Sequence, residues 1–209
     1  MMEQVKRFKR EITTLEALPN ELLVEVFGYV NGVDTVYAFF KLNTRFQCLL
    51  NDYVRDFDFK STSKAKFDFV IQVHNTQQWR SLCLSNGDLT PGQIRAFCQL
   101  CPPREHLDQI QSLTVLDMTP EYASEFLLQI NSLQYLTSLS IERVCGSNIP
   151  AMNLPALKQL RVTSCRNIDW IMVCRIHLSA SNIHFYFRIS SIWIIFNTPS
   201  NTVVVIVFA

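Results

Sequence analysis

Residues 18–30, LPNELLVEVFGYV, predict a helix whose apolar face is wider than its own small module requires. At about 100° per residue, six apolar side chains fall on one arc of roughly 160°, whereas a helix that covers a core needs a stripe of about 100°. They are Leu22, Leu23, Val26, Phe27, Tyr29 and Val30. The surplus face is therefore expected to contact something beyond the neighbouring helices.

Two further short helices are expected before residue 55. Asp34 is placed to cap a second helix, VYAFFKL, and Asn43 to cap a third, TRFQCLLNDYV. Because the connections are short, the three helices must pack together, and so small a module cannot bury every apolar side chain. Part of the first helix and the aromatic residues Phe39, Phe40 and Phe46 are therefore expected to stay exposed or to be covered by something else.

Residues 15–50 resemble an F-box, with an ordinary three-helix cap on a larger domain as the alternative. The matching features are a Leu-Pro-x-Glu opening, a Leu-Leu-x-x-Val-Phe run, an acidic start to the second helix and a Leu-x-x-Arg-aromatic close. They comprise Leu18, Pro19, Glu21, Leu22, Leu23, Val26, Phe27, Asp34, Leu42, Arg45 and Phe46. Leu42 and Phe46 replace the commoner Val and Trp of that close.

An F-box binds a Skp-type adaptor, which links it to a cullin–RING ubiquitin ligase. The resemblance therefore implies that the adaptor covers the surplus apolar face. Burying four or five such side chains, at about 1.5–3 kcal/mol each, is enough to drive association. The implied adaptor-binding residues are Leu18, Pro19, Leu22, Leu23, Val26, Phe27, Val30, Leu42 and Phe46.

A second pattern follows a polar connector, STSKAKFDF. The frame apolar-x-x-Leu-x-Leu occurs at Trp79–Leu84, Leu113–Met118, Leu136–Ile141 and Leu157–Val162, with its central leucines 34, 23 and 21 residues apart. The last two intervals suit leucine-rich repeats, and helical stretches lie between the frames. Strand followed by helix predicts a curved parallel sheet with outer helices; a generic α/β domain is the alternative.

Positions between the repeat leucines are expected on the concave face of this sheet. Leucine-rich repeats commonly follow an F-box and act there as the substrate-reading surface. The intervening positions are Ser81, Cys83, Val115, Asp117, Ser138, Ser140, Gln159 and Arg161. The candidate substrate-binding residues are Ser81, Asp117, Ser138, Ser140, Gln159 and Arg161.

The expected fold class is α plus α/β: a small N-terminal three-helix F-box followed by a short, irregular leucine-rich-repeat solenoid of parallel strands and outer helices. The expected boundaries are a basic leader at 1–14, the F-box at 15–55, a connector at 56–72, about four repeat units at 73–170 and an apolar tail at 171–209. The runs IWIIF and TVVVIVFA make this tail strongly β-prone. It forms final strands with a cap or is an aberrant end such as a mis-joined exon, and the second is slightly favoured.

The composition excludes several classes of partner. The 19 basic and 18 acidic residues give a net charge of +1, which does not suggest nucleic acid or an anionic membrane as a partner.

Residues 197–202 break the apolar tail, so no conventional membrane span is expected. The chain start does not read as a signal peptide, and Lys6, Arg7, Lys9 and Arg10 read as a solvated leader or a nuclear address. The cytosol, with access to the nucleus, is the expected location.

No cofactor, metal or catalytic group is expected. The seven cysteines, at positions 48, 83, 98, 101, 145, 165 and 174, are expected to be reduced, buried thiols. Cys98 and Cys101, with His106 nearby, have the spacing of half a zinc site, but a matching fourth ligand is missing. His74, His177 and His184 are isolated, and no nucleophile motif or glycine-rich phosphate loop occurs.

The predicted function is substrate recognition in a Skp–cullin–F-box ubiquitin ligase. The chain is expected to bind the adaptor through its helices and a protein substrate of unknown identity through its repeats. It would act by positioning, without contributing a reacting group. A non-degradative interaction scaffold that uses the same two surfaces is the alternative; a hydrolase or metal enzyme would require bound zinc or turnover.

Overall fold

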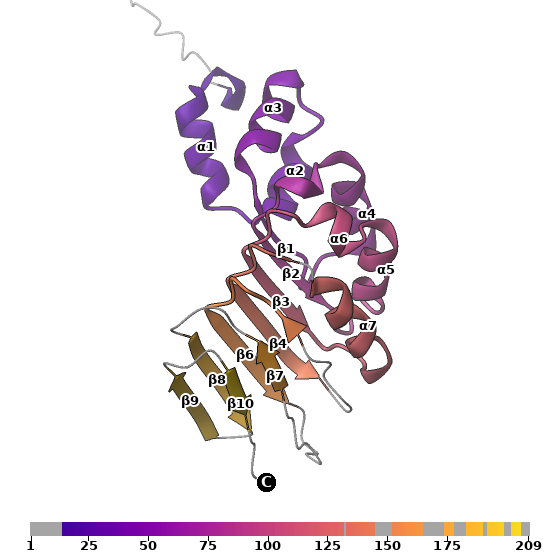
Figure 1. Cartoon of the computed structure of the whole chain (residues 1–209). Helices are drawn as coiled ribbons and strands as arrows, with labels where there is room; N and C mark the ends of the chain where they lie inside the picture. The colour runs from indigo at the N-terminus through magenta and orange to yellow at the C-terminus, as the bar shows by residue number, and fades with distance from the viewer. Residues whose placement is uncertain are drawn as a thin grey trace, which may run out of the picture.

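The computed structural model describes residues 14–131, 133–144, 152–164, 174–177, 183–189, 192–198 and 202–205. The chain is of mixed α/β class, with N-terminal helices followed by a mainly parallel sheet (Figure 1). The predicted basic leader lies outside the described residues, apart from residue 14. Within the described residues, no helix combines the length and apolar character that crossing a bilayer requires.

Three α-helices form in the region where the sequence predicts them, after a 3₁₀ turn at Leu15–Ala17. They are α1 (Asn20–Gly28), α2 (Gly32–Phe39) and α3 (Thr44–Tyr53). The Asn43 side chain accepts a hydrogen bond from the Phe46 amide at 3.1 Å, which confirms the predicted cap of α3. The predicted cap of α2 is wrong: Asn31, not Asp34, accepts from the Val33 amide at 3.1 Å, and Asp34 lies inside the first turn.

The larger sheet has seven strands in the order β1-β2-β3-β4-β6-β8-β9. Its neighbours pair in parallel as far as β8, and β9 pairs with β8 antiparallel. The strands are β1 (Asp56–Asp58), β2 (Ser81–Ser85), β3 (Ser112–Leu116), β4 (Ser138–Val144), β6 (Gln159–Ser164), β8 (Ile183–Ile189) and β9 (Ile192–Thr198). A second sheet has the order β10-β7-β5, with β5 at Met152–Asn153, β7 at Cys174–His177 and β10 at Thr202–Val205.

Helices cover one side of the larger sheet (Figure 1). They are α4 (Lys64–Val73), α5 (Gln93–Leu100), α6 (Pro103–His106) and α7 (Pro120–Ile130), with a 3₁₀ turn at Thr76–Gln78. The helices α1, α2 and α3 lie beyond the β1 edge of the sheet (Figure 1). The described parts of residues 171–209 are the strands β7 to β10; that this end is aberrant stays a prediction.

The repeating frame is present, but its second copy lies three residues earlier than predicted. Leu113 pairs in register with Leu82 and with Leu139, so the frame in β3 runs from Ile110 through Leu113 to Val115. The sequence allowed both alignments because Leu113 and Leu116 each fit a leucine position. With this correction the central leucines of β2, β3, β4 and β6 are 31, 26 and 21 residues apart.

The predicted connector at 56–72 is wrong, because this segment contains β1 and most of α4. Val54, Phe57 and Phe59 repeat the same frame one unit earlier, and all three side chains are buried. Alternating aspartates at positions 56 and 58 made the strand look like a polar loop. In α4, Phe67 and Val70 are buried in the same core.

A backbone pattern shows that β1 belongs to the array. The carbonyl oxygen of Arg55 accepts hydrogen bonds from two consecutive amides at the next strand, those of Arg80 at 2.9 Å and Ser81 at 3.2 Å. The carbonyls of Arg80, Gln111 and Thr137 each accept a corresponding pair from the unit that follows. The identical pattern stacks successive units in the same orientation.

An aromatic cluster joins the helices to the first strands. The Trp79 ring stacks on Phe57 with 4.2 Å between centroids, and its indole N–H donates to His74 Nδ1 at 3.0 Å. His74 Nε2 lies 3.2 Å from the carbonyl oxygen of Leu50 in α3. Since Nδ1 accepts from Trp79, the neutral ring carries its proton on Nε2 and donates it to Leu50.

We predict that acid destabilises this cluster. Burial lowers the pKa of His74, so the unfolded chain, with an ordinary pKa of about 6.5, takes up the proton more readily. The stability contributed by the neutral ring is therefore present above that pH and is lost progressively as the pH falls below it. The free energy of unfolding, measured in urea, should fall more steeply from pH 7 to pH 5 in the wild type than in His74→Gln. An equal fall in the two proteins would contradict the prediction.

Candidate functional site: an apolar surface on the N-terminal helices

One side of α1 presents apolar side chains to solvent. Leu22 is 47% exposed, Val26 38%, Val30 40% and Tyr29 83%. They lie one or two turns apart on a single face of the helix and its C-terminal extension, and we call these four residues the apolar stripe. Leu42, between α2 and α3, is 46% exposed. Rows of large apolar side chains exposed on a protein surface are typical of interaction sites.

Three of the predicted adaptor-binding residues are buried by this chain itself: Leu23, Phe27 and Phe46. Phe27, Phe39 and Phe46 form a triangle of rings with centroids 5.5–6.2 Å apart. The expectation of a surface role for Phe46 and for the inner half of the α1 arc is therefore wrong, because these side chains are the core of the helical module. Of the other predicted contacts, Leu18 is half-buried and Pro19 is exposed.

Arg45 holds the start of α1 in place. Its guanidinium donates three hydrogen bonds: to the Glu16 carbonyl at 2.7 Å, to the Leu18 carbonyl at 2.6 Å and to Asn20 Oδ1 at 2.7 Å. Sequence reasoning noted Arg45 as part of a motif but gave it no contact. Its five fixed N–H donors suit this task, which a single ammonium group does not match.

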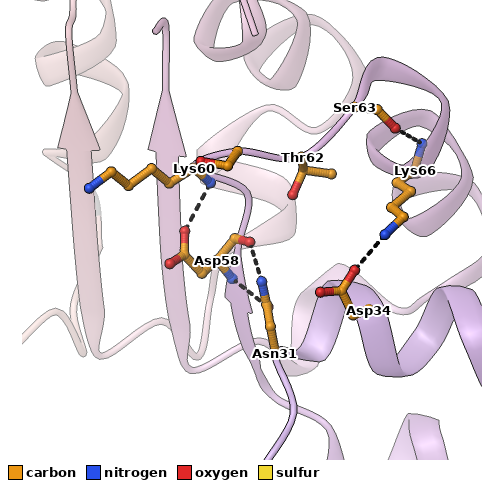
Figure 2. Close-up of a pocket in the computed structure, with 8 residues that line it drawn as sticks. Asn31, Asp34, Asp58, Lys60, Thr62, Ser63 and Lys66 are labelled. Atoms are coloured by element: carbon orange, nitrogen blue, oxygen red, sulfur yellow. Dashed lines mark hydrogen bonds and ion pairs between the residues drawn. The ribbon is translucent and has the colours of Figure 1, made fainter. Parts of the chain in front are cut away.

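The N-terminus of α2 closes the outer edge of β1. The Asn31 side chain donates to the Asp58 carbonyl at 2.7 Å and accepts from the Asp58 amide at 3.2 Å, as a neighbouring strand would (Figure 2). At Gly32, any Cβ would overlap the Asp56 carbonyl oxygen and lie 2.9 Å from Val54 Cγ1. The helical module therefore sits directly on the sheet, and the edge of β1 is protected from other strands.

Glycine 32 provides a direct test of this seating. Gly32→Ala should lower the free energy of unfolding by about 1–3 kcal/mol, since the added methyl group forces α2 away from β1. Gly28→Ala is the matched control: nothing lies within 4 Å of its Cβ position, and alanine there should stabilise by about 0.5–1 kcal/mol. Urea denaturation measures both; a Gly32→Ala variant as stable as the wild type would mean that α2 is not seated on β1.

The predicted substrate-binding residues lie mainly on the face of the sheet opposite the buried leucines. Ser81 and Ser138 align in one cross-strand row that also contains Gln159, and Ser140 aligns with Arg161 in the next. The serines are half-buried between neighbours, whereas Gln159 and Arg161 are exposed. This face is lined mainly by polar side chains, which is compatible with binding a protein surface but specifies no ligand.

Two predicted positions differ from expectation. Val115 is buried, so Thr114 takes the place assigned to it; the frame error displaced this part of the face by one residue. Asp117 follows β3 with a φ of 56° and forms a bidentate pair with Arg143 at 2.6 Å, so it lies at the end of the strands. Ser112 and Thr114 are exposed-face positions that sequence reasoning missed.

The described thiols are in different environments. Cys101 is buried and Cys83 and Cys98 are half-buried, but Cys48 is exposed, against expectation. Burial and the Asp58 carboxylate raise the pKa of Cys83 to about 12; burial chiefly raises the pKa of Cys98 to about 11. No group of three or more His, Cys, Asp or Glu suited to a metal occurs in the described residues. Predictions for Cys145, Cys165, Cys174, His177 and His184 lie outside the side chains that the structure describes.

We predict a corresponding order of alkylation. At pH 8, iodoacetamide should modify Cys83 and Cys98 at least about tenfold more slowly than Cys48, because the reactive thiolate is scarce and poorly accessible at both sites. Mass spectrometry of peptides sampled over time measures the three rates. Unfolding in urea should make them equal; a fast Cys83 in the folded chain would contradict the structure.

Comparison of the chain with protein-family models, with curated proteins and with solved structures finds no match.

Proposed function

We propose that this chain is the substrate-recognition subunit of a Skp–cullin–F-box ubiquitin ligase. In this proposal residues 15–55 are an F-box that binds a Skp-type adaptor, and the strand units that follow are leucine-rich repeats that bind a protein substrate. The observation that carries the proposal is the exposed apolar stripe on α1, set on helices whose sequence resembles an F-box. Complete burial of such side chains is favourable by about 1.5–3 kcal/mol each.

The division between buried and exposed side chains supports this assignment. Leu23, Phe27 and Phe46 already fill the interior of the helical module. The stripe can therefore be covered by a partner while the module keeps its own core. Glu21 and Glu25 are exposed beside the stripe on α1, so the apolar patch has a polar border, as protein interfaces do.

The repeat assignment is supported by the register of the strands. The central positions Phe57, Leu82, Leu113, Leu139 and Leu160 occupy the same row of the parallel sheet. These five side chains are buried on the helix-covered side, while mainly polar residues occupy the other face. A substrate bound on that face would contact several units at once.

The contact between α2 and β1 supports the proposed receptor function because it fixes the orientation of the two proposed binding faces. A ubiquitin ligase receptor accelerates transfer by holding a substrate lysine near a charged conjugating enzyme, which raises its effective concentration. Here Asn31 and Gly32 join the adaptor-binding helices directly to the first strand. The proposed substrate face is thus held at a fixed orientation to the proposed adaptor face, and the chain supplies no reacting group of its own.

The adaptor surface is tested by placing charges on the stripe. Leu22→Asp with Val26→Asp should weaken binding to a Skp-type adaptor at least about 100-fold, because two carboxylates would be buried without partners. The midpoint of thermal unfolding should shift by no more than about 2 °C, since both side chains are already solvent-exposed. Pull-down and calorimetric titration with the purified adaptor measure the effect, and cullin in the captured complex would distinguish a ligase from a scaffold.

The control places the same charges on another exposed apolar site. Leu100 in α5 is 55% exposed and Leu128 in α7 is 51% exposed, so their replacement by Asp matches the chemistry away from α1. This double variant should bind the adaptor like the wild type. If the stripe variant is still captured normally while it remains folded, the proposed function is rejected.

A further inference from the structure

Two of the five glycines in the chain directly follow an asparagine, in the pairs Asn31-Gly32 and Asn86-Gly87. Asparagine is one of the thermolabile residues of proteins. It loses its side-chain nitrogen without an enzyme when the next backbone nitrogen attacks the side-chain carbonyl carbon, and glycine leaves that nitrogen unshielded by a side chain. Only the first of the two pairs lies where the helical module meets the sheet.

The fold requires this labile pair at the contact between α2 and β1. Gly32 has no room for a side chain, since a Cβ would lie 2.2 Å from the Asp56 carbonyl oxygen. The Asn31 side chain must both donate and accept: its nitrogen donates to the Asp58 carbonyl at 2.7 Å, and its oxygen accepts from the amides of Asp58 and Val33. A side-chain amide has both functions on one planar group.

The attacking nitrogen is available at Gly32. This residue is the first of α2, and its N–H donates no hydrogen bond within the part of the chain that the structure describes. Asn31 also lines a hollow of about 340 Å³ beside β1 (Figure 2). A hollow of this size with polar walls admits water. Water can therefore reach the pair and complete the reaction by hydrolysis.

The second pair is held in the interior of the sheet. The Gly87 amide donates to Ser85 Oγ at 3.1 Å, and the Asn86 side-chain oxygen accepts from the Ile94 amide at 3.0 Å. The backbone amide of Asn86 donates to the Leu116 carbonyl, which ties the pair to both β2 and β3. These are interior strands, whereas β1 is the first strand of the sheet. An element at an edge opens locally at a lower cost than an interior one.

We propose that Asn31 is a site of spontaneous deamidation that releases the helical module from the sheet. When the Asn31 side chain leaves Asp58, the Gly32 nitrogen gives its proton to water and attacks Asn31 Cγ. The bond from Cγ to Nδ2 then breaks, and ammonia leaves with a proton taken from water. The five-membered succinimide that remains is opened by a second water molecule. The reaction consumes one water and releases one ammonia, and nothing is oxidised or reduced.

Both products lack the hydrogen bond that closes the edge of β1. Ring opening at the side-chain carbonyl gives aspartate, which places a carboxylate oxygen where the Asn31 nitrogen donated to the Asp58 carbonyl. Ring opening at the main-chain carbonyl gives isoaspartate, which adds a methylene group to the backbone just before Gly32. The close approach of Gly32 to Asp56 leaves no space for that displacement. Neither the adaptor nor a substrate takes part in this reaction.

The first test compares the two pairs in the full chain, kept folded or unfolded in urea at mildly alkaline pH. Mass spectrometry of peptides from an acidic digest records deamidation at residues 31 and 86 over time. The two rates should be similar in urea. In the folded chain Asn31 should react at least about tenfold faster than Asn86, because opening at the sheet edge costs less than opening between interior strands. Equal rates in the folded chain, faster reaction at Asn86, or no reaction at Asn31 overturns the proposal.

The second test measures what the modification does to the contact. The chain is aged in an Asn86→Gln background, in which only the first Asn-Gly pair remains, and the isoaspartate form is separated by ion exchange. Compared with the fresh Asn86→Gln chain, the amides of Asp58 and Val33 should exchange with solvent at least about tenfold faster, since their common acceptor is displaced. The amides of β3 and β4 should keep their rates. Unchanged exchange at Asp58 in the isoaspartate form overturns the proposal.

Discussion

The backbone of α2 rests on the first strand of the sheet at Gly32, and the relation between the two halves of the molecule depends on this contact. Side chains usually keep the backbone of a helix apart from the backbone of a strand. Here the absence of a side chain lets the helix end approach the Asp56 carbonyl. Asn31 then completes the edge of β1 with two hydrogen bonds to Asp58. The first helices and the array of strands are consequently one continuous body.

The structure also depends on how the apolar side chains are arranged around the first helix. Its wide apolar arc is divided between the interior of the chain and solvent, with Leu23 and Phe27 turned inward and Leu22 and Val26 turned outward. If only inward-facing apolar side chains were present, the helix would simply cover the neighbouring helices. If only outward-facing ones were present, the helical module would have no hydrophobic core. The division explains how a small helical module can fold and still present an apolar surface for a second polypeptide.

Local signals in the sequence located most of the helices. Asn43 caps α3 as predicted, because a side chain that bonds the third amide of a helix acts within one turn. The cap of α2 was misplaced because Asn31 and Asp34 are both residue types that cap helices, and the bonds that fix Asn31 on Asp58 span 27 residues. Such long-range pairing leaves no signature in local sequence.

The repeat pattern was predictable as a pattern but not in its alignment. In β3 the closely spaced apolar residues Leu113, Val115 and Leu116 satisfy two frames, and only pairing with Leu82 selects between them. The β1 unit was missed because it uses Phe57 and Phe59 where leucine was sought. The apolar stripe was predicted as part of a wider face; which of its residues turn inward depends on the ring triangle of Phe27, Phe39 and Phe46, which forms only in the folded module.

Amide hydrogen exchange of the full chain, with and without a saturating Skp-type adaptor, tests the central claim most directly. If the adaptor covers the apolar stripe on α1, amide exchange should slow at residues 18–30 and around Leu42. The amides of β2, β3 and β4 should keep their exchange rates. Slower exchange on those strands with α1 unchanged would place the adaptor elsewhere and contradict the account.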